Sequence, residues 1–197
     1  MDHLTATLCT RNEHKRRELE RALPGWTIEL LAATNYPAET GVTFYENALA
    51  KARFGRRVGP AGDWMLGEDS GLELRAFDGA PGIETARWAN GCHVERALAA
   101  LEHVDNRAAR YVCALVALSP DGREARGTGT LDGTMAFEPR GTEGFGFDPL
   151  FVPLGETQTV AELGADWKAE HSHRALAARS LRVALPSSAT AGERGAE

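Results

Sequence analysis

The sequence has few cysteines and no long apolar run, and each shortage argues against a class of protein. No stretch approaches the ~18 apolar residues of a membrane span, so we expect no membrane partner. The three cysteines, Cys9, Cys92 and Cys113, form no CxxC pair, which disfavours a disulfide framework and favours a reducing compartment. The first three residues lack the charged-then-apolar order of a signal peptide. Together these features predict a cytoplasmic protein.

The chain also lacks a basic excess. Its net charge is −6 and its pI about 5.6, so the overall balance gives no sign of nucleic-acid binding. At 197 residues and 43% hydrophobic, it is long enough to bury a substantial core. There are no repeats and no low-complexity linker. We therefore expect a single domain over residues 1–186, followed by a frayed polar tail over 187–197.

Lysine is scarce, and its positions are informative. Of 22 basic residues only Lys15, Lys51 and Lys168 are lysines, and the rest are arginines. A lysine that persists in such a chain suggests a need for a compact point charge rather than a planar fork. Each of the three lies beside a polar motif suited to phosphate. The alternative is chance survival of solvated surface lysines, but three such coincidences favour function.

Hydrophobic patterning predicts a mixed sheet flanked by helices. The periodicities and breakers indicate strands at 4–9, 26–31, 64–66, 72–74, 111–118, 124–131, 134–137 and 149–152. They indicate helices at 12–23, 43–58, 93–104 and 172–184. Thr43 and Glu46 form a capping box. Gly67 to Gly71 and Asp132-Gly133 read as points where a strand ends or turns.

The first chemistry-bearing segment lies where the first strand becomes the first helix. Main-chain N–H groups at a helix start attract anions, and hydroxyl, amide and lysine side chains add donors. The segment resembles a phosphate cradle without the glycines of a P-loop. The alternative is a simple helix cap. Its residues are Thr10, Arg11, Asn12, Glu13, His14 and Lys15.

The second segment is an adjacent pair of carboxylates, Glu68 and Asp69, followed by Ser70 and Gly71. Such a pair at a strand end suits Mg²⁺ binding and activation of water. A polar turn would use the same residue types.

Two further segments suit a flat ligand. The glycines around Phe145, in Gly144 to Pro149, would let the backbone approach a ring that Phe147 stacks on and Asp148 accepts from. A turn with a buried phenylalanine is the alternative. Ser172-His173-Arg174 offers polar edges at a helix start. His171 and His173 have no third ligand at zinc-like spacing, so we expect no zinc site.

The order of these motifs is more specific than any one of them. The chain reads TxNxxK, TFxENAxxKA, EDSG, APGIxxAR, GFGFDP and then a lysine followed by SHR. This order closely resembles the inosine triphosphate pyrophosphatase family, also called Ham1-like. The resemblance extends from about residue 4 to residue 185.

The resemblance implies an elongated α/β fold: a mixed, strongly bent sheet flanked by helices, with two lobes and a central substrate cleft. It implies a homodimer that hydrolyses noncanonical purine nucleoside triphosphates (ITP, dITP, XTP) to the monophosphate and pyrophosphate, with Mg²⁺. Such an enzyme clears unwanted nucleotides from the cellular pool.

The resemblance also implies roles for individual residues. Asp69 would activate water, and Asp69, Glu68 and Glu39 would hold the metal. The residues of 10–15 would bind phosphates with help from Lys51, and Ser70 would bind substrate. The base pocket would comprise Phe145, Gly146, Phe147, Asp148, Lys168, His173 and Arg174. A 6-oxo purine presents an acceptor to Arg174, whereas adenine presents a donor, which leaves buried groups unpaired at a cost of roughly 1–3 kcal/mol.

One position departs from the family pattern. Many members place two acids before Thr-Gly ahead of the second helix, and here Ala38 stands in the first position with Glu39 in the second. Glu39 takes over the metal, or the metal rests on Glu68 and Asp69. Two other functions stay open: a nucleotide-binding homologue without catalysis, and a pyrophosphatase for another modified nucleotide in a dedicated pathway.

Overall fold

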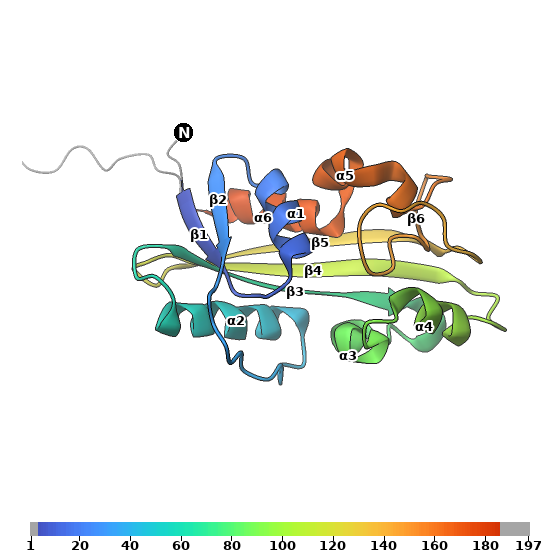
Figure 1. The fold of residues 1–197 in the computed structure, drawn as a ribbon, viewed down its shortest axis with the longest axis horizontal. Helices are drawn as coiled ribbons and strands as arrows, with labels where there is room; N and C mark the ends of the chain where they lie inside the picture. The colour runs from blue at the N-terminus through green and yellow to red at the C-terminus, as the bar shows by residue number, and fades with distance from the viewer. Residues whose placement is uncertain (1–3, 186–197) are drawn as a thin grey trace, which may run out of the picture.

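A computed structural model of the protein describes residues 4–185, so the predicted tail at 187–197 lies outside the described residues. Figure 1 shows an elongated molecule built on a single open sheet. The six strands have the order β2-β1-β3-β4-β5-β6. β1 pairs in parallel with β2 and β3, and all other pairs are antiparallel, so the predicted mixed sheet is confirmed.

The first strand-helix-strand unit follows its sequence pattern. Strands β1 (Leu4–Leu8) and β2 (Trp26–Leu30) enclose helix α1 (Glu13–Ala22). Leu8, Leu19 and Ile28 have no exposed surface. Burial of such side chains contributes about 1.5–3 kcal/mol each, and holds α1 on the sheet. The start of α1 is thereby fixed at the end of β1.

The strand that begins at Trp64 does not end at the Gly67–Gly71 segment. β3 runs through it (Trp64–Leu74) and pairs with β4 along its length. The two glycines are contact positions and not breakers. A Cβ on Gly67 would lie 1.9 Å from the carbonyl oxygen of Ala48, so only glycine lets helix α2 (Phe44–Val58) approach the strand.

The late hairpin is confirmed, with a longer second strand than expected. β4 (Ala108–Leu118) and β5 (Glu124–Met135) pair in unbroken register, and Asp132-Gly133 lies within β5 instead of turning. A Cβ on Gly133 would lie 2.3 Å from the carbonyl oxygen of Val152, so this glycine admits the short strand β6 (Phe151–Pro153).

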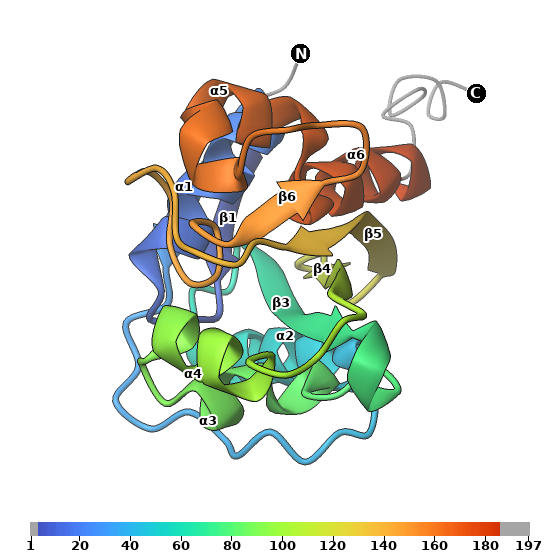
Figure 2. The same cartoon turned by 90° about the vertical axis from the view of Figure 1, so that its right-hand side faces the viewer.

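Helices cover both faces of the sheet, as Figures 1 and 2 show. On one side lie α2, α3 (Thr85–Ala89) and α4 (His93–Ala100), together with two short 3₁₀ turns, η1 (Arg75–Phe77) and η2 (Gly82–Glu84). On the other lie α1, α5 (Val160–His171) and α6 (His173–Ala184). The sequence patterns missed α3 and α5 and overextended α4. α5 is interrupted by Gly164, whose φ of 82° breaks the helical periodicity.

Helix α6 rests directly on strand β5. A Cβ on Gly129 would lie 2.1 Å from the carbonyl oxygen of His173, and one on Gly127 the same distance from that of Ala177. Two glycines therefore bring the start of α6, with His173 and Arg174, onto the middle of the sheet. Among residues 4–185, none of the helices has the length and apolar character needed to cross a lipid bilayer.

Candidate active site

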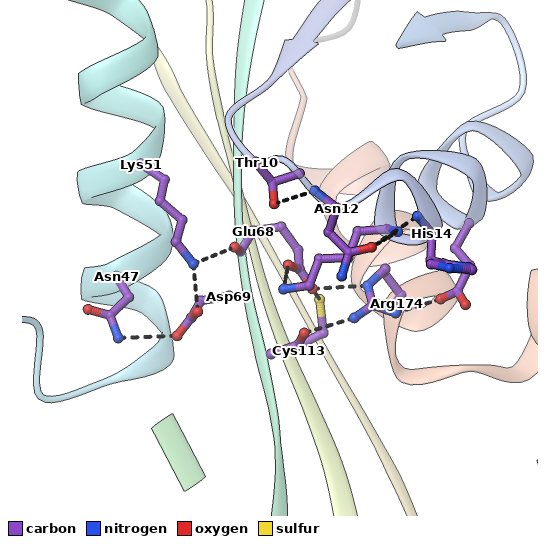
Figure 3. A network of polar contacts seen from close by, with 12 residues as sticks. Thr10, Asn12, His14, Asn47, Lys51, Glu68, Asp69, Cys113 and Arg174 are labelled. Carbon is purple, nitrogen blue, oxygen red and sulfur yellow. Dashed lines mark hydrogen bonds and ion pairs between the residues drawn. The ribbon is translucent and has the colours of Figure 1, made fainter. Parts of the chain in front are cut away.

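The centre of the site is the middle of β3, where two adjacent carboxylates point to opposite faces of the sheet. Successive side chains in a strand alternate, so Asp69 faces α2 while Glu68 faces α1 and α6 (Figure 3). Both are buried. The two carboxylates therefore belong to different networks, and they do not face one metal ion together.

Asp69 belongs to the network on the α2 side. The ammonium of Lys51 lies 2.7 Å from Asp69 Oδ1, and the amide of Asn47 donates to Asp69 Oδ2 at 3.2 Å. Asn47 and Lys51 are one helical turn apart, and the absence of a side chain at Gly67 brings that face of α2 close. Burial raises the pKa of Asp69 even though Lys51 opposes the shift.

Lys51 Nζ is surrounded by three oxygens. Besides Asp69 it contacts the main-chain oxygen of Glu68 at 3.1 Å and Glu39 Oε1 at 2.6 Å. Glu39 comes from the segment between β2 and α2, which Tyr36 fastens by donating to the carbonyl oxygens of Thr10 and Leu31. Glu39 and Asp69 therefore contact the same ammonium group. The preceding residue, Ala38, has no acidic side chain to offer at this place.

Glu68 belongs to the network on the other face. Lys15 Nζ lies 2.6 Å from Glu68 Oε2, and Arg174 Nε lies 2.9 Å from Oε1. Burial disfavours the charge on Glu68, but Lys15 and Arg174 outweigh it and hold its pKa well below the usual range. The thiol of Cys113 donates to Glu68 Oε1, and burial raises the pKa of that thiol well above its ordinary value. Cys113 is therefore no thiolate nucleophile.

A further acid links the cations of this face. Glu18, on α1, lies 2.5 Å from Arg174 and 2.5 Å from Lys168. Burial disfavours its charge, yet Arg174 and Lys168 hold the pKa of Glu18 below its ordinary value. Sequence reasoning missed Glu18. Its position three residues after Lys15 on one helix face was the available signal.

Asp148 and Lys168 meet at the far end of the same network. Lys168 Nζ lies 2.5 Å from Asp148 Oδ2, and the hydroxyl of Tyr111 donates to Oδ1 at 3.3 Å. The main-chain N–H of Phe145 donates to Oδ2, and Gly144 allows this turn through its φ of 80°. Burial raises the pKa of Asp148 while Lys168 opposes the shift.

The ring of Phe145 covers these cations. It stacks on His14 at a centroid separation of 5.0 Å, and it lies 5.0 Å from Lys168 Nζ and 5.5 Å from the guanidinium of Arg174. Such contacts orient an aromatic face. The ring is also only half-buried, so it can present a surface to a flat ligand.

His173 is fully enclosed and uncharged. Burial, assisted by the charge of Arg174, lowers its pKa well below the usual value. Its ring stacks on Tyr111 at 4.7 Å, and its Nδ1 has no hydrogen-bond partner. A buried N–H without a partner is rarer than a buried acceptor without one. The proton of the neutral ring is accordingly placed on Nε2.

A cavity of about 160 Å³ lies beside β3 and is lined by residues of α1, α5 and α6 from one side of the sheet and of α3 and α4 from the other. It receives ten of the residues that the sequence predicted: Asn12, Lys15, Ser70, Phe145, Gly146, Phe147, Asp148, Lys168, His173 and Arg174. It is completed by six that sequence reasoning missed: Gly71, Leu72, Thr85, Ala86, His93 and Tyr111.

Several predicted residues lie elsewhere. Arg11 donates to the carbonyl oxygen of Thr34 and lies over the ring of Tyr36. Glu13 pairs with two arginines on the surface of α1, which lower its pKa to about 2. Thr10 does not line the cavity; its hydroxyl accepts from the main-chain N–H of Asn12, whose own side chain lines the cavity and caps α1 by accepting from the main-chain N–H of Lys15.

The oxygens around Lys51 fit a divalent cation. Within residues 4–185, no three His, Cys, Asp or Glu side chains gather into a metal site by themselves. Mg²⁺ instead uses one or two carboxylates together with substrate phosphates. Asp69 and Glu39 already share one cation, the ammonium of Lys51, and the main-chain oxygen of Glu68 lies beside them.

Comparisons with known proteins agree on one family. The model described as Ham1 family matches residues 6–184. A protein from Streptomyces avermitilis, named dITP/XTP pyrophosphatase, is 44% identical over 88% of this chain and 93% of its own. One of the same name from Frankia alni is 42% identical over 92% and 97%. A solved HAM1 protein structure from Coxiella burnetii superposes with a TM-score of 0.77 at 33% identity, covering 91% of this chain and 97% of that one.

Proposed function

Because this chain belongs to the Ham1 family, we propose that it hydrolyses noncanonical purine nucleoside triphosphates such as dITP, ITP and XTP. The products are the nucleoside monophosphate and pyrophosphate, so the protein is a pyrophosphohydrolase that acts on an acid anhydride. The observation that carries this conclusion is the nearly end-to-end similarity to relatives named dITP/XTP pyrophosphatase. The cavity described above supplies the matching chemistry.

The purine base is held at the Phe145–Asp148 end of the cavity. Phe145 stacks on the ring, and Lys168 and Arg174 offer N–H donors toward it. A 6-oxo purine accepts from such donors, whereas the 6-amino group of adenine is itself a donor. His173, protonated on Nε2, adds a further donor. The pocket therefore favours hypoxanthine and xanthine over adenine.

The triphosphate extends from the start of α1 toward Lys51. Lys15 lies on the first turn of α1, where main-chain N–H groups attract phosphate, and Thr10 and Asn12 shape that turn. Ser70 lines the cavity between this point and the base. Lysines at both ends of the phosphate chain neutralise the charge that builds up during transfer.

Asp69 accepts the proton of the attacking water. Water oxygen forms a bond to the α-phosphorus, the bond to the bridging oxygen of the β-phosphate breaks, and the proton passes to the Asp69 carboxylate. The raised pKa of Asp69 suits a general base, and Lys51 with Asn47 fixes its orientation. Glu68 keeps its charge and positions Lys15 and Arg174 instead.

Nucleotide pyrophosphatases of this kind typically need a divalent metal ion, and we propose Mg²⁺. Bound Mg²⁺ would neutralise phosphate charge and make the attacking water more acidic. Asp69 and Glu39 would hold it, with the main-chain oxygen of Glu68 as a third donor. This arrangement assigns Glu39 the place left open by Ala38.

Product analysis tests the reaction. The protein with Mg²⁺ and ITP should yield IMP and pyrophosphate in equal amounts. Release of orthophosphate would contradict cleavage between the α- and β-phosphates, and tight nucleotide binding without products would favour the binding-protein alternative. A much faster reaction with another modified nucleotide would favour a dedicated pathway.

We also propose a homodimer, as the family resemblance implies. Light scattering on the purified chain should give twice the mass of a 21.2 kDa protomer. A monomeric mass at working concentration would contradict it.

A further inference from the structure

One motif has no role in the proposed reaction: the segment from Ala80 to Arg87. It forms η2 and the short helix α3 at the side of the sheet that Asp69 faces. Thr85 fastens it, because its hydroxyl donates to the carbonyl oxygen of Gly82 at 2.6 Å and accepts from the main-chain N–H of Leu72 at 2.9 Å. The backbone that carries Arg87 is thus fixed against β3.

Arg87 lies between two carboxylates at this edge of the site. Its guanidinium is 2.5 Å from Glu84 and 3.6 Å from Glu39 Oε2. The other oxygen of Glu39 contacts Lys51, which contacts Asp69. Two cations, Arg87 and Lys51, therefore share Glu39 next to the reacting carboxylate.

Arg87 is more exposed to solvent than the cations Lys15, Lys168 and Arg174 around the cavity. Lys168 and Arg174 are buried, and the Lys15 side chain is 17% exposed. They pair with the acids Glu68, Glu18 and Asp148, whose side chains are at most 16% exposed. The Arg87 side chain is 48% exposed, and its partner Glu84 is 54% exposed. An exposed pair is weak, and separating it leaves no buried acid without a partner. Arg87 can therefore turn to a phosphate at little cost.

The position of Arg87 indicates which phosphates of the substrate it would contact. The base end of the cavity lies on the Glu68 face, and Asp69 marks the bond that breaks. The part of the triphosphate beyond that bond, the β- and γ-phosphates, then lies toward Lys51 and Glu39. Arginine binds phosphate oxygens in a bidentate manner, which a lysine cannot do.

We propose that Arg87 leaves Glu39 and Glu84 to bind the β- and γ-phosphates, the group released as pyrophosphate. Glu39 is the internal anion that Arg87 contacts in the absence of phosphate. This inference rests on the proposed function, since it takes the pyrophosphate unit as the leaving group. It adds a residue that holds the leaving group and does not touch the base.

Calorimetric binding of inorganic pyrophosphate and of IMP, each with Mg²⁺, tests the assignment. Arg87→Ala should weaken pyrophosphate binding about tenfold or more, as expected for loss of a charged hydrogen-bond pair, and should leave IMP binding unchanged. Arg87→Lys should recover part of the loss. Arg110→Ala is the matched control, because Arg110, near the start of β4, is 47% exposed and pairs with an exposed acid, Asp132.

The outcomes separate this inference from the function itself. Equal pyrophosphate binding by wild type and Arg87→Ala, including binding too weak to detect in both, overturns the assignment. An equal loss in Arg110→Ala overturns it as well, because the effect would then reflect general charge. Failure of the wild type to release pyrophosphate from ITP would instead remove the proposed function.

Discussion

At the scale of single residues, the site depends on opposite environments for two neighbouring acids. Glu68 and Asp69 are adjacent in β3, yet the pKa of Glu68 is lowered and that of Asp69 is raised. Because side chains alternate along a strand, Glu68 faces Lys15 and Arg174, whereas Asp69 is buried and faces Lys51. Pairs of carboxyls separated in this way divide their roles. In the proposed reaction Glu68 organises the cations and Asp69 takes the proton.

Asp69→Asn should lower kcat at least a hundredfold, because general-base help contributes roughly 10²–10⁴-fold. The raised pKa also fixes a pH dependence. Asp69 must be ionised to act, so the rate should fall as pH decreases through a pKa above the usual 3.8 of an aspartate. Comparing kcat of wild type and variant at saturating ITP checks the first point, and the pH profile of kcat/KM for ITP checks the second. An unchanged rate in the variant would remove Asp69 from the mechanism.

Glu18→Ala should destabilise the fold by about 1–3 kcal/mol at pH 7, because Lys168 and Arg174 each lose one of their two acidic partners while Asp148 and Glu68 stay in contact with them. The pKa of Glu18 is lowered in the folded state, so its contribution is complete above the ordinary value of 4.5 and disappears as pH falls through the folded pKa. Urea unfolding of wild type and variant at pH 7 and below pH 4.5 measures this. A difference that grows toward acid pH would contradict the assignment.

At the scale of elements, close approach of helices to strands assembles the site. Gly129→Val should displace α6 and with it Arg174, because even a Cβ there lies 2.1 Å from the carbonyl oxygen of His173. We expect loss of activity with ITP together with a lower melting temperature. Gly62→Ala is the control, since a Cβ at Gly62 meets nothing within 4 Å. If both variants kept wild-type activity and melting temperature, α6 could pack on β5 without a glycine at position 129.

We predict that the segment before α2 sets the dependence of the rate on Mg²⁺. Glu39→Ala should raise the Mg²⁺ concentration needed for half-maximal rate, because it removes one of two carboxylates beside the proposed ion. Ala38→Glu should lower that concentration by restoring the acid of the family pattern. Rate against Mg²⁺ at saturating ITP compares the three proteins. Superimposed curves would show that this segment does not touch the metal.

Local sequence signals located most elements but misjudged the glycines. The strands and helices with clear periodicity, β1, α1, α2 and α6, begin and end within a residue or two of expectation. Gly67 and Gly133 looked like breaks, yet each lies inside a strand where another backbone passes close. A sequence read locally cannot tell such a contact from a turn. For the same reason it missed α5, which a glycine interrupts.

At the scale of the whole molecule, the cavity is assembled from segments far apart in the chain. Ten of the residues that line the cavity were predicted from the order of the Ham1-like motifs. Their spacing in the sequence does not by itself indicate that they lie close together. Arg174 and Glu68 are 106 positions apart, and Tyr111 and Asp148 are 37 apart. Such contacts arise from the sheet order and the seating of α1 and α6. The contact of Tyr111 with Asp148, and the contacts of Glu18 and Arg87 with their partners, therefore became visible only in the fold.

The central claim is that this fold selects a 6-oxo purine triphosphate, and one measurement tests it most directly. That measurement is the ratio of kcat/KM for ITP to kcat/KM for ATP, with pyrophosphate release as the readout. A site built to donate to a 6-oxo group rejects the 6-amino analogue because buried donors then face each other. We predict a ratio of at least about 100 in favour of ITP. A ratio near one would contradict the account, since the buried cations around Phe145 would then not read the base.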